Sequence, residues 1–227
     1  MTSQFKGARI AGLMYLFALV TAVFSEFYIR SSLFVWANVG ETASNIANSE
    51  GFFRTAIVSD LSSFAGIVVL AVSLYLVVKP VNPYLALIAL CWWLGQAFIL
   101  GMTTLNSFII LSLVSGAGYL AAFDAGQLHA LVGLFVRGHY AGYDIGLIFF
   151  SLGSSAFAYL LFKARLVPRP LVLFGLLASL LFLTGTVTLF LLPEVSPLVR
   201  QVINPPIALY ELLIGLWLLI KGARVTP

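Results

Sequence analysis

Apolar stretches long enough to cross a lipid bilayer recur six times along this chain of 227 residues. A helix needs about 20 predominantly apolar residues to cross the hydrocarbon layer. The chain is 61% hydrophobic and 9% charged, whereas about a quarter of the residues in soluble domains are charged. Because backbone polar groups must be satisfied internally in lipid, such stretches form helices. We therefore predict an all-α polytopic membrane protein, built as a six-helix transmembrane bundle.

A single transmembrane domain is expected over residues 1–227, with no second domain. Its spans are predicted at about 7–29, 51–78, 84–114, 138–163, 168–192 and 198–221. Two longer connections are expected to hold short interfacial helices, at Glu41–Asn48 and at Leu128–Val136, the second following a capping box of Asp124 and Gln127. Asn204-Pro205-Pro206 is predicted to break or kink the sixth span near its start.

Charged residues divide cleanly between the two sides of this topology. The side with both termini collects only basic residues: Lys6, Arg9, Lys79, Lys163, Arg165, Arg169, Lys221 and Arg224. The other side receives the acids Glu26, Glu41, Glu50, Asp60, Asp124, Asp144 and Glu194, together with Arg30, Arg54, Arg137 and Arg200. The positive-inside rule then predicts cytoplasmic termini in a multi-pass protein of the inner (plasma) membrane.

Several functional classes lack the residues they need. The net charge of +4 is small and scattered, so nucleic acid is not an expected partner. One cysteine and two histidines do not supply a usual zinc or haem ligand set, so we predict no cofactor and no metal. His139 with Asp60 and Asp144 is a weak metal alternative. The catalytic motifs sought are absent, so no catalytic residue is predicted, and whether the chain is an enzyme stays open.

The segment Arg137–Phe150 combines charge with small residues. Arg137 and Asp144 share one helical face because residues seven apart align. Gly138, Gly142 and Gly146 form a stripe with a four-residue period, a pattern that allows close packing of membrane helices. We expect this stripe to pack against another helix, and it could also support a homo-oligomer.

Polar residues on separate spans predict a cavity that opens to the outer face. Its mouth is expected at Glu26, Arg30, Arg54, Arg137 and His139, its walls at Asp60, Asn106, Asp144 and Asn204, and its floor at Glu211. Acids inside spans usually face the bundle interior or a cavity. A structural alternative holds for several of them: Glu26 and Arg30 have the spacing of an interfacial ion pair, and Arg54 and Arg137 can extend to lipid headgroups.

Three functions fit these residues. The first is binding or transport of a small cation, an amine or protons through the acid-lined cavity. The second is an intramembrane enzyme or binder for a lipid or isoprenoid of the outer leaflet, with arginines holding a phosphate. The third is a structural or accessory subunit. Membrane lipid is the expected partner in each case, with a small molecule or a lipid as the possible ligand.

Motifs spread over the chain resemble an uncharacterised bacterial membrane family, domain of unknown function 4386. The matching segments are Arg9–Gly12, Glu26–Arg30, Ser49–Arg54 with Asp60-Leu61, Lys79–Asn82, Phe123-Asp124 with Gln127-Leu128, His139–Phe150, Leu166–Arg169 and Trp217–Gly222. The chain departs from the family pattern at Trp92-Trp93, where many members have an arginine. The resemblance implies the membrane topology and implies no activity.

Overall fold

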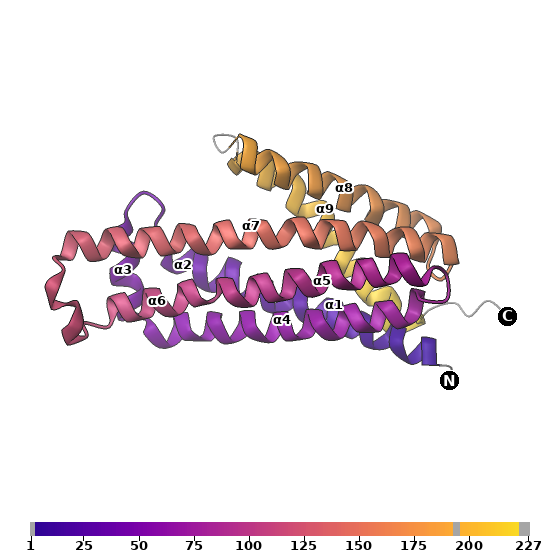
Figure 1. Ribbon diagram of the computed structural model, residues 1–227, viewed down its shortest axis with the longest axis horizontal. Helices are drawn as coiled ribbons and strands as arrows, with labels where there is room; N and C mark the ends of the chain where they lie inside the picture. The colour runs from indigo at the N-terminus through magenta and orange to yellow at the C-terminus, as the bar shows by residue number, and fades with distance from the viewer. Residues whose placement is uncertain (1–2, 193–195, 223–227) are drawn as a thin grey trace.

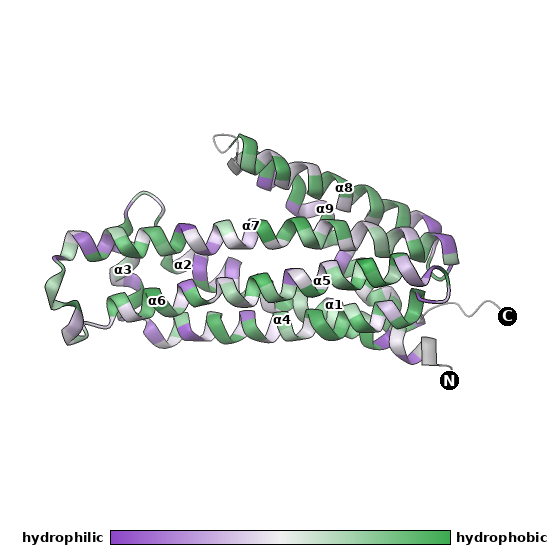
Figure 2. Ribbon diagram, viewed as in Figure 1, coloured by the Kyte–Doolittle hydropathy of each residue, from purple (hydrophilic) through white to green (hydrophobic). Residues whose placement is uncertain are grey.

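A computed structural model describes residues 3–192 and 196–222, and this part of the chain is helical, with no strand. Glu194 and Arg224, two of the charges used to predict orientation, lie outside the described residues. Among the described residues, six helices are long and apolar enough to cross a membrane: Lys6–Leu33, Glu50–Val78, Pro83–Val114, Ala125–Ala164, Arg169–Leu191 and Leu198–Lys221. The predicted all-α fold with six spans is confirmed. Apolar residues dominate the length of the helices (Figure 2).

Both described chain ends lie at one end of the bundle, here called the terminal end (Figure 1). The opposite end, the loop end, carries the two longer connections. The first contains α3 (Val39–Asn48), where the side chain of Asn38 caps the helix by accepting from the backbone N–H of Glu41. The second contains only a 3-10 turn, η2 (Gly118–Ala122). The helix predicted over Glu41–Asn48 in the first connection is present, as α3.

The fourth span, α7 (Ala125–Ala164), is a single helix of 40 residues. The predicted capping box is confirmed, since Asp124 and Gln127 exchange side-chain to backbone hydrogen bonds at its start. However, Leu128–Val136 is not a separate short helix, because the helix continues from it through Gly138 into the predicted span. No proline interrupts this region, and one glycine is too weak a breaker to end a helix. At this length α7 extends about 60 Å, roughly twice the hydrocarbon thickness.

The last span, α9 (Ser196–Lys221), continues through Pro205 and Pro206. The expected break at this triplet does not occur. The two prolines remove backbone donors for only two carbonyls, those of Gln201 and Val202, and the following turns keep their hydrogen bonds. The sixth span is therefore one continuous helix, and a break in it does not contribute to the candidate site.

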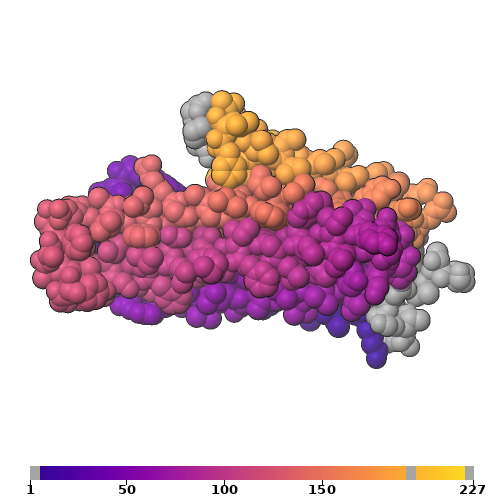
Figure 3. Space-filling view, viewed as in Figure 1, coloured from indigo at the N-terminus to yellow at the C-terminus, as the bar shows by residue number. Residues whose placement is uncertain are grey.

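Neighbouring spans in the sequence are neighbours in space, and the first also meets the last. The pairs in contact are α1 (Ser3–Val23) with α4 (Glu50–Val78), α4 with α5 (Pro83–Thr103), α5 with α7, α7 with α8 (Arg169–Leu191), α8 with α9, and α9 with α1. The six spans thus form a closed ring around one axis. Toward the loop end, the tips of α8 and α9 stand apart from α7 (Figures 1 and 3).

Aromatic side chains fill the axis of the ring on the terminal side. Trp93 of α5 stacks on Phe150, meets Tyr15 and Phe157 edge-on, and donates its indole N–H to the carbonyl of Phe150 at 3.1 Å. Phe182 of α8 meets Phe150 edge-on. Because Trp93 is 1% exposed, this part of the axis is closed by packed rings.

The glycine stripe of α7 faces a neighbouring span of the same chain. A Cβ atom at Gly138, Gly142 or Gly146 would meet the side chain of Asn106, Thr103 or Leu100, respectively. These residues belong to α5 and α6 (Leu105–Val114), the two halves of the third span. The stripe is therefore filled by packing within one chain, as expected, and an oligomer would have to use another surface.

Candidate functional site

The first span changes from an α-helix to a π-helix at its loop end. This segment, η1, comprises Phe24–Arg30, and it is followed by one α-helical turn, α2 (Ser31–Leu33). A π-helix is rare, and single π turns often lie at functional sites. Glu26 and Arg30, which were both predicted site residues, lie on η1. The π turn itself left no signal in the sequence.

Arg30 is fully buried and joins three polar residues from two helices. Its Nη1 atom lies 2.7 Å from Oε1 of Glu26 and donates to Oγ of Ser25 at 2.5 Å. Its Nη2 atom lies 2.5 Å from Oδ2 of Asp60 on α4. The predicted Glu26–Arg30 pair is therefore present, and its arginine is buried inside the protein. The planar fork of a guanidinium suits such double pairing.

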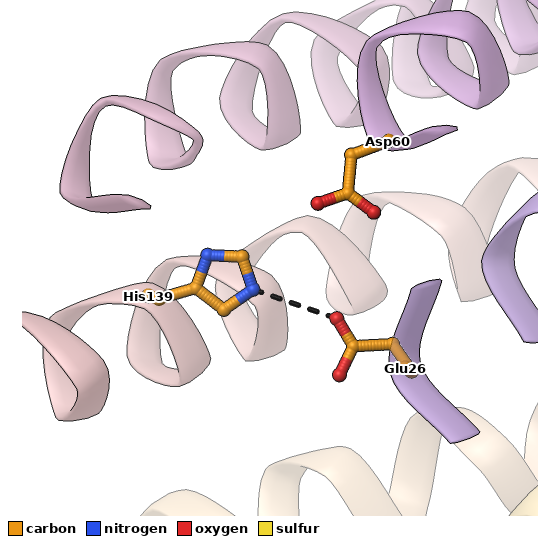
Figure 4. Close-up of side chains that lie close together, drawn as sticks. All are labelled: Glu26, Asp60 and His139. Carbon is orange, nitrogen blue, oxygen red and sulfur yellow. Dashed lines mark ion pairs between the residues drawn. The ribbon is translucent and has the colours of Figure 1, made fainter. Parts of the chain in front are cut away.

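His139 of α7 points at the same carboxylates (Figure 4). Its Nε2 atom lies 3.5 Å from Oε1 of Glu26, which is longer than a normal hydrogen bond. The side chain is 4% exposed, and neither ring nitrogen has a hydrogen-bond partner in the described part of the chain. A buried polar group is normally satisfied, and this imidazole is one of several buried side chains among the described residues that are not. It is the one that faces the carboxylates of Glu26 and Asp60.

Tyr140, beside His139, closes the site toward the loop end. Its hydroxyl donates to Oε2 of Glu26 at 3.2 Å. Its ring lies 5.0 Å from that of Trp36 and 6.3 Å from that of Phe34, centroid to centroid. Trp36 and Phe34 also line a small hollow of about 30 Å³ next to Arg137. A water molecule needs about 10–15 Å³ of such space, so this hollow has room for about two water molecules and no larger ligand.

We call Glu26, Arg30, Asp60 and His139 the Arg30 cluster. With a neutral imidazole it carries two negative charges and one positive charge, a net charge of −1. The side chains of Glu26 and Asp60 are 17% and 6% exposed, so little water is present to screen that charge. Net charge in a low-dielectric interior is unfavourable. The cluster is therefore one positive charge short of neutral.

Ligand atoms of Glu26, Asp60 and His139 all lie within 4.8 Å of one another, close enough to share a metal ion. The acid pair differs from the weak alternative considered from the sequence, since Glu26 takes the place of Asp144. Arg30 already holds one oxygen of each carboxylate. A divalent ion would bring the cluster to +1 beside a guanidinium, whereas a single positive charge neutralises it.

The other predicted site residues lie elsewhere. Arg54 pairs with Glu50 at 2.6 Å on an exposed part of α4, and Arg137 is exposed beside the small hollow. Asn106 donates to the carbonyl of Thr103 at 2.9 Å and packs on Gly138. Arg54 and Arg137, two of the predicted mouth residues, and Asn106, a predicted wall residue, therefore do not join the Arg30 cluster.

Three more predicted residues lie along α7 and α9. Asp144 pairs with Arg200 at 2.6 Å, which links α7 to α9 where the two helices diverge. Asn204 and Glu211 are half-buried on α9. The predicted set therefore divides into the Arg30 cluster, one peripheral pair and a separate carboxyl at Glu211.

Sequence reasoning missed Ser25, Tyr140 and Tyr143 as neighbours of the acids. A serine or tyrosine in a span is usually a packing or hydrogen-bonding residue, so neither type stood out. The segment Arg137–Phe150 was singled out, and within it Tyr143 follows His139 by one turn on the same helical face. This shared helical face was the sequence pattern that could have identified Tyr143 as a neighbour of the site.

A closed ring of six apolar helices with an ion-paired cluster inside one end defines a polytopic integral membrane protein. The family model for "Domain of unknown function (DUF4386)" matches residues 10–222, nearly the whole chain. The chain belongs to this family, as its motifs suggested. A search of curated proteins and a search of solved structures found no match.

Proposed function

We propose that this membrane protein binds one positive charge at the Arg30 cluster, either a proton or a small monovalent cation. The observation that carries the proposal is the shared guanidinium: Glu26 and Asp60 both pair with Arg30, while His139 has no hydrogen-bond partner among the described residues. One bound positive charge would neutralise the buried cluster. The imidazole of His139 would bind the proton or act as a ligand of the cation.

A proton and a cation would use different atoms of the same site. A proton would bind to His139, whose Nε2–H would then donate to Oε1 of Glu26 and shorten the present 3.5 Å separation. A small cation would bind between the carboxylate oxygens of Glu26 and Asp60, with a neutral imidazole nitrogen as a further ligand. Both forms have the same total charge, so the two would compete.

Tyr140 and Trp36 form the proposed entrance. Trp36 lines the small hollow, Tyr140 donates to Glu26 of the cluster, and the centroids of their two rings are 5.0 Å apart. Trp36 is 66% exposed, so it would move without disturbing the core.

The lipid-enzyme alternative has less support. It requires several arginines that converge on a headgroup phosphate. In the described part of the chain, Arg54 pairs with Glu50, Arg200 pairs with Asp144 and Arg30 is enclosed by carboxylates. The accessory-subunit alternative relied on the glycine stripe, which packs within the chain.

The fluorescence of Trp36 should report whether the Arg30 cluster has bound a positive charge. The ring of Trp36 contacts that of Tyr140, and the hydroxyl of Tyr140 donates a hydrogen bond to Glu26. Purified full-length protein is titrated with acid, and separately with Na⁺, K⁺ and methylammonium at fixed pH, while tryptophan fluorescence is recorded. A Trp36→Phe variant identifies the signal. We expect a one-site change in the wild type.

Two variants and a control decide the assignment. Glu26→Gln and Asp60→Asn each bring the unoccupied cluster to zero charge, so both are expected to lose the response. Glu50→Gln alters an exposed acid on the same helix as Asp60 and is expected to keep it. A response that survives in both cluster variants, or no response to any of the cations and to acid, overturns the proposal. The titrations with Na⁺, K⁺ and methylammonium show whether the bound species is a proton, a metal cation or an amine cation.

A further inference from the structure

Three hydrogen-bond acceptors converge where η1, α4 and α7 meet. Ligand atoms of Glu26, Asp60 and His139 all lie within 4.8 Å of one another, and the three side chains point toward one another (Figure 4). A single atom placed among them would lie no more than about 2.8 Å from each, which is the usual distance between a charged N–H donor and its acceptor. The triangle of acceptors therefore has the size of a site for one charged nitrogen.

The two carboxylates keep acceptor positions that the protein itself does not fill. An ionised carboxyl group has about four lone-pair positions. Among the described residues, Glu26 receives hydrogen bonds from Arg30 and Tyr140. Asp60 receives one from Arg30. Each carboxylate therefore retains room for about two further donors, in a region with little water to supply them.

His139 supplies the third acceptor, and it is the residue that points to a ligand. Its side chain is 4% exposed, and neither ring nitrogen has a hydrogen-bond partner among the described residues. A neutral imidazole has one acceptor nitrogen. When Nε2 is that acceptor, it faces the acceptor Oε1 of Glu26 at 3.5 Å, and a donor between them would satisfy both. Because acceptors on two N–H groups of one ammonium lie about 4.6 Å apart, this pair would separate by about 1 Å on binding.

We propose that the Arg30 cluster is a selective site for an ammonium group, either the ammonium ion or a small primary amine such as methylammonium. Glu26, Asp60 and His139 each accept one of its N–H groups. This inference rests on the proposed function and names the ligand class of the same site. A primary ammonium has three N–H donors and one positive charge. It therefore fills the three acceptors and neutralises the cluster at the same time.

Other ions with one positive charge match this arrangement less well. Alkali cations are hard ions that bind oxygen ligands, whereas one of the three ligand atoms here is the imidazole nitrogen of His139. Tetramethylammonium has the charge but no N–H group to donate. His139 is therefore the residue that sets the preference for ammonium over an alkali cation of the same charge.

Trp36 fluorescence of the full-length protein in detergent micelles tests this preference in mildly alkaline buffer, where few protons compete. The chlorides of ammonium, Rb⁺ and tetramethylammonium are titrated at constant ionic strength, because Rb⁺ is close to ammonium in size. A hydrogen bond to a charged group typically changes affinity about 10-fold or more, so ammonium should have a dissociation constant at least about 10-fold below that of Rb⁺. Tetramethylammonium should give no response.

Two histidine variants test the role of the third acceptor. His139→Phe keeps a ring and removes the acceptor nitrogen, so ammonium should then bind about as weakly as Rb⁺. His129→Phe changes the other histidine of the chain and should keep the wild-type preference. The comparison of ions in the wild type needs no variant, so a failure of His139→Phe to fold would leave the test intact.

The outcomes separate this inference from the proposed function. If ammonium and Rb⁺ bind equally well to the wild type, or if only acid gives a response, the proposed function stands and the ammonium preference is wrong. If folded His139→Phe prefers ammonium as strongly as the wild type does, His139 is not the third acceptor and the inference fails. A wild type that responds to no cation and not to acid overturns the proposed function and this inference with it.

Discussion

The Nη2 atom of Arg30 and the Oδ2 atom of Asp60 lie 2.5 Å apart, in an ion pair that joins η1 to α4 inside the bundle. Replacing Arg30 by methionine would leave two carboxylates without their shared guanidinium. Breaking a buried pair in this way costs about 3–5 kcal/mol. We expect Arg30→Met to lower the free energy of unfolding by that amount, measured by denaturant titration in detergent micelles.

Arg54→Met is the control for this prediction. Arg54 also pairs with an acid four residues away, but both side chains are about half exposed. Exposed pairs contribute about 0–1 kcal/mol. Equal losses of stability in the two variants would show that the Arg30 pair is no stronger than a surface pair.

Close packing of α1 on α9 depends on Gly12. A Cβ atom there would meet backbone atoms of Leu219, Gly215 and Leu218, which have no freedom to move aside. Forced overpacking costs about 1–3 kcal/mol, so Gly12→Ala should lower the midpoint of thermal unfolding. Gly101→Ala introduces the same methyl group where no atom lies within 4 Å. It should be neutral or slightly stabilising, and a comparable loss in both variants would refute the α1–α9 packing.

Divalent metals should bind poorly despite the ligand geometry of Glu26, Asp60 and His139. Their charge would leave the buried cluster at +1 beside Arg30. Equilibrium dialysis with Zn²⁺ is expected to show no stoichiometric binding that depends on His139. One zinc per chain, lost in His139→Gln and retained in His129→Gln, would contradict the single-charge account.

Asp144 and Arg200 hold the start of α9 near α7, across the region where the two helices diverge. Their side chains are 13% and 33% exposed, so the pair should contribute about 1 kcal/mol or less. Asp144→Asn should raise amide hydrogen exchange in the first turns of α9 about fivefold. Glu41→Gln, an exposed change in α3, should leave those rates unchanged. Unaltered exchange in Asp144→Asn would mean that the pair does not restrain α9.

Orientation in the membrane is predicted by the basic residues of the terminal end. Single cysteines are introduced as Lys79→Cys or Ser115→Cys, each in a Cys91→Ser background. A membrane-impermeant thiol reagent added to intact cells should label the second and not the first. The opposite labelling pattern would invert the topology and place the Arg30 cluster near the cytoplasmic face.

Sequence alone identified the spans because hydropathy and helix capping act locally. Asp124 and Gln127 show this directly, since a capping box needs no tertiary contact. The length of α7 was missed because Arg137 and Gly138 resemble a helix start, although neither residue ends a helix. The predicted break at Pro205 and Pro206 is absent because the surrounding turns maintain the helix.

Which of the candidate residues come together in space could be predicted only in part. The acids inside spans pointed to an interior cluster, and Glu26, Arg30, Asp60 and His139 indeed meet. Which acid faces which base depends on the order of helices around the ring and on the π turn that carries Arg30. Both are tertiary features, and no local pattern separates Asp60, which joins the cluster, from Asp144, which pairs with Arg200.

The protein's small histidine content allows one measurement that tests the central claim directly. With two histidines in the chain, histidine-selective ¹⁵N NMR gives signals from two imidazole rings, each with two nitrogens, and His129→Gln assigns them. The account predicts that the ring nitrogens of His139 respond to acid or to a monovalent cation in the wild type. It also predicts that this response is lost in Glu26→Gln under the same conditions. Identical responses of His139 in both proteins would contradict the claim that the Arg30 cluster accepts one positive charge because it is one charge short.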